Sequence, residues 1–296
     1  MLVNLRKTWG MNDKFAAFIL SHGRADNVYT YQTIRKAGYS GRIIIIIDNQ
    51  DKQIEEYKKK YKEQVYVFNK EKIAKTTDNG DNFNNLRTTT HVRNAIFGAA
   101  KELGIDSFVM LDDDYTDFRY KFSSAGKYGD WIIKKNLGNI FNATIDFLNE
   151  ADSLLCIAYS QGGDFIGGAE GTGAKAIKVK RKVMNSFFCL TSRPFKFLSR
   201  LNEDVNTYIT IGARGGLFLT TNQFALQQKE TQTNSGGMSD AYLDSGTFVK
   251  SFYTVMYAPS CSIVSPMGAV NPRLHHKITW RHAVPKILQE NLKKNA

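Results

Sequence analysis

The chain has 296 residues, of which 42% are hydrophobic, and it carries a formal net charge of +12. This length suits one large α/β domain, and the hydrophobic share excludes a chain that is disordered throughout. The apolar runs near the start are far shorter than the ~20 residues that cross a bilayer, and three scattered cysteines form neither a zinc motif nor a disulfide framework.

The first 115 residues alternate between strand and helix patterns. Apolar runs predict strands at 14–20, 42–47, 65–68 and 107–111, and helical spacing predicts helices at 27–37, 50–61 and 86–103. Repeated strand–helix units imply a parallel sheet covered by helices, which binds its ligands at the carboxyl ends of the strands. Residues 21–24, Asp48 and residues 112–114 follow three of these strands, so we expect them to converge.

The second half of the chain is less regular. We expect a helix at 136–150, a strand at 153–159, a glycine-rich loop at 161–173, strands with basic faces at 176–190, a mobile polar loop at 227–238, and helices at 241–250 and 285–293. The glycine-rich loop has neither Walker A nor Rossmann spacing, which favours a mobile loop over a phosphate cradle. No repeat or linker divides the chain, so we predict a single domain over residues 1–296.

The positive charge is concentrated in two segments. The tail, residues 271–296, has six basic residues against one acid. Residues 171–202 contain no Asp or Glu but eight basic residues, which are Lys175, Lys178, Lys180, Arg181, Lys182, Arg193, Lys196 and Arg200. A bias of this segmental kind favours a polyanionic partner, nucleic acid in particular, over a merely solvated surface.

Three aspartates, residues 112–114, come directly after a predicted buried strand that ends at Leu111. Neighbouring carboxylates repel one another, so the cluster favours a bound divalent cation, and hard oxygen ligands suit Mg²⁺ or Mn²⁺. The alternative is an acidic turn that faces water. Arg93, in the helix before this strand, either reaches back to the carboxylates or lies on the helix surface.

Two later groups also admit two interpretations each. Asp204 is either a general base that deprotonates an acceptor hydroxyl or an acid in the first turn of a helix that Asn202 caps. His275 and His276 either contribute to a metal site or form a plain surface pair.

In their order along the chain these residues resemble the glycosyltransferases of the GT-A type. The matching segments are Ser21-His22-Gly23-Arg24, Asp48 after the isoleucine strand, Arg93-Asn94, the triplet at 112–114 in the place of an Asp-x-Asp motif, the Glu-Asp of residues 203–204, and a late histidine. More narrowly, FILSHGRADNVYTYQTIRKAGY and LDDDYTDF are similar to the TET/J-binding-protein-associated glycosyltransferases. That family includes phage enzymes thought to add sugars to hydroxymethylpyrimidines in DNA.

The resemblance implies a GT-A-like α/β fold, with a mixed, mostly parallel sheet flanked by helices. Residues 14–120 would bind the nucleotide sugar, with UDP as the expected nucleotide, and residues 121–296 the acceptor. The implied donor-binding residues are Ser21, His22, Arg24, Asp48, Arg93, Asp112 and Asp113. Mn²⁺ or Mg²⁺ would bind Asp112, Asp114 and His276, with His275 as the alternative histidine, and Asp204 would be the acceptor base if the reaction inverts the configuration of the sugar.

The implied acceptor is 5-hydroxymethylcytosine in double-stranded phage DNA, in the host cytoplasm, without a membrane or a protein partner. The residues expected on DNA phosphates are Lys178, Lys180, Arg181, Lys182, Arg193 and Lys196. The phenylalanines between them (187, 188, 195 and 197) are expected in the core, although one could wedge into a base step beside a flipped base. The alternatives are a polysaccharide or protein acceptor, or a DNA-binding protein without activity on the same scaffold.

Overall fold

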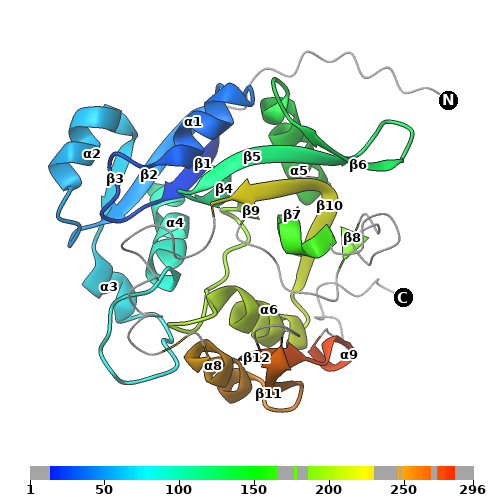
Figure 1. Ribbon diagram of the computed structural model, residues 1–296. Coiled ribbons are helices and arrows are strands. Elements are labelled where there is room, and N and C mark those ends of the chain that lie inside the picture. Colours follow the sequence, from blue (N-terminus) through cyan, green and yellow to red (C-terminus); the bar gives the residue numbers. More distant parts are fainter. Residues whose placement is uncertain are drawn as a thin grey trace.

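A computed structural model describes residues 14–165, 177–178, 186–229, 246, 248–267 and 272–283. Its main sheet is built from β1 (Phe15–Leu20), β2 (Arg42–Asp48), β3 (Val65–Phe68), β4 (Ser107–Asp112), β5 (Tyr115–Phe122), β6 (Tyr128–Ile132), β7 (Leu154–Gln161), β8 (Ile177–Lys178), β9 (Phe187–Leu190) and β10 (Leu217–Gln228). A separate hairpin is formed by β11 (Ser262–Met267) and β12 (Arg273–Ile278). Figure 1 shows this hairpin at the opposite end of the molecule from α1 and α5.

The helices are α1 (Tyr29–Lys36), α2 (Ile54–Tyr61), α3 (Lys70–Ala74), α4 (Thr90–Glu102), α5 (Leu137–Glu150), α6 (Glu203–Ala213), α8 (Val249–Tyr257) and α9 (Trp280–Ala283). The helices predicted at 27–37, 50–61, 86–103 and 136–150 are therefore confirmed as α1, α2, α4 and α5. Within the described ranges, no helix is long and apolar enough to span a membrane.

The main sheet is mixed, in the order β3-β2-β1-β4-β9-β7-β10-β5-β6, with β8 beside β10. The strands β3, β2, β1 and β4 are parallel neighbours, and β7 is parallel to β10. The strand β9 is antiparallel to both β4 and β7, and β5 is antiparallel to β10. The predicted mixed sheet flanked by helices is thus confirmed, and its longest parallel part is β3-β2-β1-β4.

Side chains of β1 alternate between two hydrophobic clusters, one on each face of the sheet. Phe15 and Ile19 join the cluster that contains Phe141 of α5, whereas Phe18 joins the cluster that contains Ile96 of α4. Successive residues of a strand point to opposite faces, so a strand covered on both sides is apolar throughout. This explains the run of five isoleucines in β2, all of them buried.

Several predictions for the later segments fall mostly outside the described residues. The helix expected at 241–250 falls mostly outside the described residues, and α8 begins only at Val249. The expected helix at 285–293 lies wholly outside them, as does most of the glycine-rich loop. Of the basic strands expected at 176–190, β8 and β9 are described, and the whole of β9 is buried.

Candidate active site

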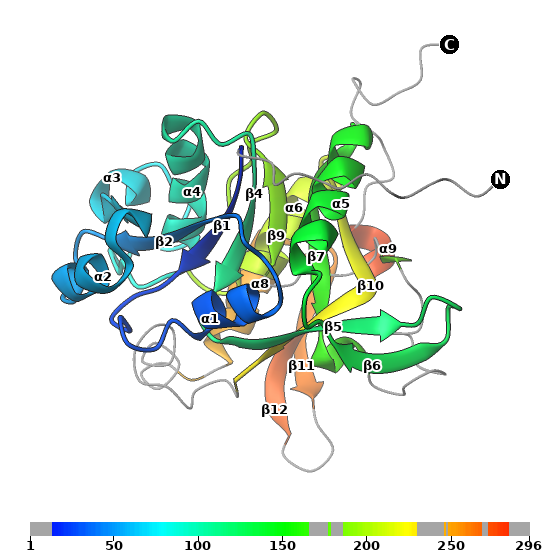
Figure 2. The same ribbon diagram turned by 90° about the horizontal axis from the view of Figure 1, so that it is seen from above.

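The carboxyl ends of β1 and β4 meet at one edge of the sheet, where Ser21 contacts the aspartate triplet. Its backbone N–H donates to the carbonyl of Ile46, 3.2 Å away, so β1 and β2 end together. Its hydroxyl donates to Oδ2 of Asp113 at 2.6 Å and lies 2.7 Å from the Tyr57 hydroxyl. The predicted convergence of residues 21–24 with the triplet is therefore present in the fold, where β1 and β4 run side by side in the same direction (Figure 2).

Asp113 is held inside the protein by the loop after β1. Its Oδ1 lies 3.0 Å from Nη1 of Arg24, and its carboxylate also accepts from Ser21. None of the three aspartates is fully exposed, so the alternative of a water-facing acidic turn is wrong. The predicted donor-binding residues Ser21 and Arg24 contact Asp113, and their role toward a nucleotide remains a prediction.

Asp112 pairs with a buried arginine that also binds α6. Nη2 of Arg93 lies 3.0 Å from Oδ1 of Asp112, and Nε lies 3.2 Å from Oε1 of Glu203. Arg93 is only 1% exposed and packs its guanidinium 4.7 Å from the centre of the Phe187 ring. The interpretation of Arg93 as a helix-surface residue is wrong, and the alternative that it reaches back to the carboxylates is confirmed.

Asp114 differs from its two neighbours because its Oδ1 is buried and accepts no hydrogen bond from any described residue. Burial raises the pKa of Asp112 to about 7, despite the charge of Arg93. Burial, together with the charge of Asp113, raises the pKa of Asp114 to about 6. A buried acceptor without a donor is costly unless a ligand completes it. The residues at this turn therefore fit a divalent cation, which would supply the missing positive charge.

The third metal ligand implied by the sequence is not brought to this turn by the described contacts. Across the described ranges, no group of three or more His, Cys, Asp or Glu side chains could hold a metal ion. His276 lies on β12, where its Nδ1 is 3.3 Å from Nδ2 of Asn202 and its ring stacks 4.2 Å from that of His275. The role of His276 as a ligand therefore stays a prediction.

The carboxylate of Asp48 has its hydrogen-bond and ion-pair partners within the protein. Its Oδ2 lies 2.9 Å from Nδ1 of His22 and 3.2 Å from Nζ of Lys70, and its Oδ1 accepts from the backbone of Gln50. Burial opposes ionisation, but the hydrogen bond from His22 and the charge of Lys70 lower the pKa of Asp48 to about 2. The side chain of His22 is 46% exposed, so His22 presents the accessible polar group at this strand end.

Residues 202–204 form the start of α6, which contacts the triplet through Arg93. Asn202 has a positive φ of 61° and its amide donates to Thr254, so the expected side-chain cap by Asn202 is wrong. Glu203 accepts from Thr89 at 2.6 Å as well as from Arg93. Asp204 is buried and its Oδ1 accepts from the N–H of Val205. These contacts give Glu203 a structural link to the triplet that the sequence pattern alone did not reveal.

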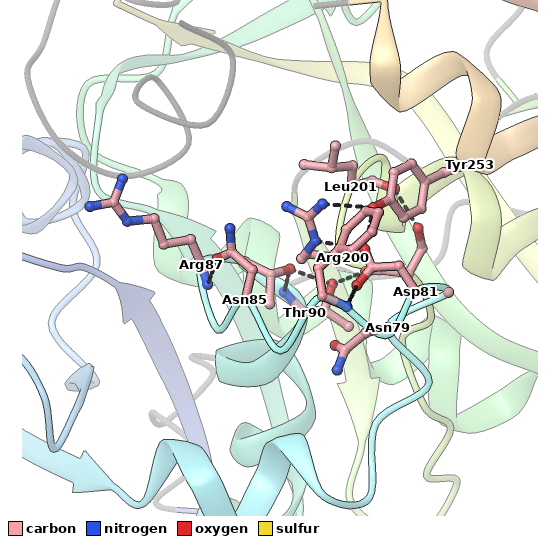
Figure 3. A network of polar contacts seen from close by, with 12 residues as sticks. Asn79, Asp81, Asn85, Arg87, Thr90, Arg200, Leu201 and Tyr253 are labelled. Carbon is pink, nitrogen blue, oxygen red and sulfur yellow. Dashed lines mark hydrogen bonds and ion pairs between the residues drawn. The ribbon is translucent and has the colours of Figure 1, made fainter. Parts of the chain in front are cut away.

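A polar network fixes the loop before α4 against the segment before α6. Nε of Arg200 lies 2.8 Å from Oδ2 of Asp81, and its Nη2 lies 2.7 Å from the hydroxyl of Tyr253, which also contacts Asp81. Thr90 donates to the carbonyl of Ser199 at 2.5 Å. Figure 3 shows Asp81, Arg200 and Tyr253 pointing toward one another. Arg200 is therefore an internal ion-pair partner and not part of a basic surface.

The structure describes the side chains of only some of the residues predicted to bind DNA. Lys180, Arg181 and Lys182 lie outside the described residues, and so does the side chain of Lys178 in β8. Lys196 is exposed and its Nζ lies 3.0 Å from the carbonyl oxygen of Thr76.

Arg193 requires a correction, because its guanidinium caps the end of α5. It donates to the backbone oxygens of Leu148, Asn149, Ala151 and Leu154 and to the carboxylate of Asp152. Carbonyls in the last turn of a helix lack intrahelical donors, and a cation there satisfies them. Arg193 therefore has a structural role in place of the predicted contact with DNA phosphates.

The phenylalanines of the basic segment lie in the core, as expected. Phe187, Phe188 and Phe197 are at most 1% exposed, and Phe195 packs its ring 5.3 Å from that of Phe97. None of the three buried rings is available as a wedge for a base step in this arrangement.

Comparison with known proteins gives one family match. The family model for the TET-Associated Glycosyltransferase matches residues 15–237. No curated protein matches the chain. A structure of glucosyl-3-phosphoglycerate synthase from Mycobacterium tuberculosis, in complex with Mn²⁺, UDP and phosphoglyceric acid, is 9% identical, with 89% of this chain and 86% of that chain covered and a TM-score of 0.43. S. aureus TarS 1–349 is 12% identical, with coverages of 81% and 65% and a TM-score of 0.42.

Proposed function

The chain belongs to the TET-associated glycosyltransferase family, and from this premise we propose that it transfers a sugar from a UDP-sugar to 5-hydroxymethylcytosine in double-stranded DNA. The observation that carries the proposal is the turn at residues 112–114. Two of its carboxylates are paired with buried or half-buried arginines, and Asp114 keeps a buried oxygen without a hydrogen-bond donor among the described residues. Such a site suits a divalent cation and a diphosphate.

On the donor side, Asp114 and Asp112 would hold Mn²⁺ or Mg²⁺, with His276 as the proposed third ligand. A bound cation of this kind neutralises charge as it develops on a diphosphate leaving group. Ser21 and Arg24 border the same turn through Asp113. With His22 at the end of β1, they would orient the nucleotide above the ends of β1 and β2.

On the acceptor side, Asp204 would take the proton of the acceptor hydroxyl. The hydroxyl oxygen then forms a bond to the anomeric carbon, and the bond from that carbon to the diphosphate breaks, with its electron pair leaving on the diphosphate oxygen. Arg93 supports both halves of the site because it bridges Asp112 of β4 and Glu203 of α6. A rigid bridge would keep the base and the leaving group at a fixed separation.

The proposed DNA acceptor is supported by charge. The chain carries +12, and residues 171–202 include no acid. Lys178, Lys180, Arg181, Lys182 and Lys196 remain the proposed phosphate contacts after the correction of Arg193. The target base would have to leave the stack to reach a pocket at a strand end.

The test is mass spectrometry of nucleosides after incubation of the protein with 5-hydroxymethylcytosine DNA, Mn²⁺ and a panel of nucleotide sugars. A mass gain of one hexose or pentose on the modified cytosine is expected, and none with Asp114→Asn. Donor hydrolysis without a mass gain would redirect the search to a polysaccharide or protein acceptor. Binding of DNA with neither turnover nor hydrolysis would favour a DNA-binding protein without activity.

A further inference from the structure

Lys229 lies beside the aspartate triplet because of where β10 ends. The last residue of β10, Gln228, pairs with Tyr115, the residue that follows the triplet. The next N–H, that of Lys229, donates to the carbonyl of Asp114 at 3.1 Å. The backbone of Lys229 is thus fixed to the turn that forms the candidate site.

The side chain of Lys229 is positioned by an aromatic ring. Its Nζ lies 3.4 Å from the centre of the ring of Tyr29, the first residue of α1. That end of α1 is itself fastened to the triplet, since Thr30 donates from its N–H to the carbonyl of Asp113 at 3.1 Å. An ammonium over a tyrosine face is attracted by the ring but keeps its hydrogen-bond donors for another partner.

Lys229 differs from the other cations at this edge of the sheet. Arg24 is paired with Asp113, Arg93 with Asp112, and Lys70 with Asp48. Lys229 forms no salt bridge with a described carboxylate; its charge acts on the nearby carboxyl of Asp114, where it opposes the rise in pKa that burial causes. A half-buried ammonium beside the triplet that is not held in a salt bridge can donate its hydrogen bonds to an anionic ligand.

We propose that Lys229 binds the diphosphate of the nucleotide-sugar donor. This inference rests on the proposed function and adds to it a residue from the end of β10, in the acceptor half of the chain. The Nζ donors contact the phosphate oxygens, whose negative charge grows as the bond to the sugar breaks. Tyr29 keeps the ammonium at the triplet before the donor arrives, so little side-chain entropy is lost on binding.

The experiment compares nucleotide and nucleoside binding by calorimetry. The ligands are UDP and uridine, and the nucleoside diphosphate and nucleoside of each of the other three bases. Each ligand is titrated into the wild type, into Lys229→Met and into the control Lys127→Met. The control changes an exposed lysine in the β5–β6 turn. We expect Lys229→Met to weaken binding of the nucleoside diphosphate about tenfold, the change that corresponds to ~1.4 kcal/mol. Binding of the nucleoside should be unchanged, and the control should match the wild type for both.

A second variant, Lys229→Arg, keeps the positive charge and should retain most of the affinity for the nucleoside diphosphate. It keeps the inference testable if Lys229→Met does not fold. Wild-type affinity in a folded Lys229→Met protein would overturn the inference and leave the proposed function standing. An equal loss for diphosphate and nucleoside would also overturn it, since the contact would not be to phosphate. If the wild type binds no nucleoside diphosphate at all, both the proposed donor and the role of Lys229 are wrong.

Discussion

Arg93 joins Asp112, at the end of β4, to Glu203, the first residue of α6. Nη2 of Arg93 lies 3.0 Å from Oδ1 of Asp112, and Nε lies 3.2 Å from Oε1 of Glu203. Three elements, α4, β4 and α6, meet at this one side chain. A buried cation between two carboxylates compensates the charge of both. When the cation is removed, both carboxylates stay buried without a positive partner.

Replacing Arg93 should therefore destabilise the fold strongly. We expect Arg93→Met to lower the free energy of unfolding by about 3–5 kcal/mol, since two carboxylates would lose their buried partner. Arg93→Lys keeps one charge but cannot bridge both carboxylates, so its loss should be intermediate. Urea unfolding at pH 7.5 measures both variants. Arg42→Met, at the exposed start of β2, should stay within about 0.5 kcal/mol of the wild type, and an equally small change in Arg93→Met would refute the bridge.

Asp114 and Asp113 should respond differently to the same conservative change. Asp114→Asn removes a carboxylate whose Oδ1 has no described donor, so the fold should keep or gain stability, by up to about 1 kcal/mol, while turnover is lost. Asp113→Asn breaks the pair with Arg24 and should lower the melting temperature. Both variants should bind DNA like the wild type. Turnover in Asp114→Asn at the wild-type rate would exclude the metal assignment.

Binding of the proposed divalent cation should depend on pH because of the carboxyl groups of Asp112 and Asp114. Their pKa values are raised above the ordinary value, to about 7 for Asp112 and about 6 for Asp114, so protons compete with a cation below that range. The rise in melting temperature on adding Mn²⁺ should be large at pH 8 and small at pH 5. Asp114→Asn should abolish most of the rise at pH 8. An equal effect of Mn²⁺ on that variant would place the cation elsewhere.

The sequence predicted the convergence of residues 21–24, Asp48 and the triplet, because these residues follow buried strands. Strand ends locate Ser21, Asp48 and the triplet without knowledge of any contact. The partners of these residues could not be predicted in the same way. Lys70 reaches Asp48 from α3, a five-residue helix with too little periodicity to detect, and Glu203 meets Arg93 across 110 residues.

The second half of the chain is harder to predict from the sequence. Its elements after α6 carry mixed polar and apolar residues, and half of the residues in β11 and β12 are exposed. A charge count assigns Arg193 to DNA because it cannot distinguish a surface cation from one that caps a helix. Only the tertiary arrangement places its guanidinium over the end of α5.

Stability should fall in mild acid because of His91. The imidazole is buried and Nε2 lies 2.9 Å from Oδ1 of Asn79. Burial, helped by the charge of Lys70, lowers the pKa of His91 from 6.5 to about 4. The unfolded state then binds a proton more readily than the folded state, so this stabilisation is complete above pH 6.5 and is lost as the pH falls toward 4. The full loss is about 3 kcal/mol.

Other groups titrate in the same range, so the difference between the wild type and His91→Gln isolates this effect. Glutamine can still donate to Asn79 but does not gain a proton. The stability advantage of the wild type over His91→Gln should shrink between pH 6.5 and 4.5. Parallel pH profiles of the two proteins would show that His91 is not buried as described.

Neutralising the basic segment separates DNA binding from folding. Replacing Lys180, Arg181 and Lys182 together by Ala should weaken DNA binding. The slope of the logarithm of the binding constant against the logarithm of the salt concentration should fall by up to about 0.9 for each phosphate that the variant no longer neutralises. Arg193→Ala should leave that slope unchanged and instead lower the melting temperature, because its guanidinium donates to the end of α5. Fluorescence anisotropy with duplex DNA at several salt concentrations measures the slopes. An unchanged slope in the triple variant would move the DNA face to another part of the chain, and a reduced slope in folded Arg193→Ala would restore Arg193 to it.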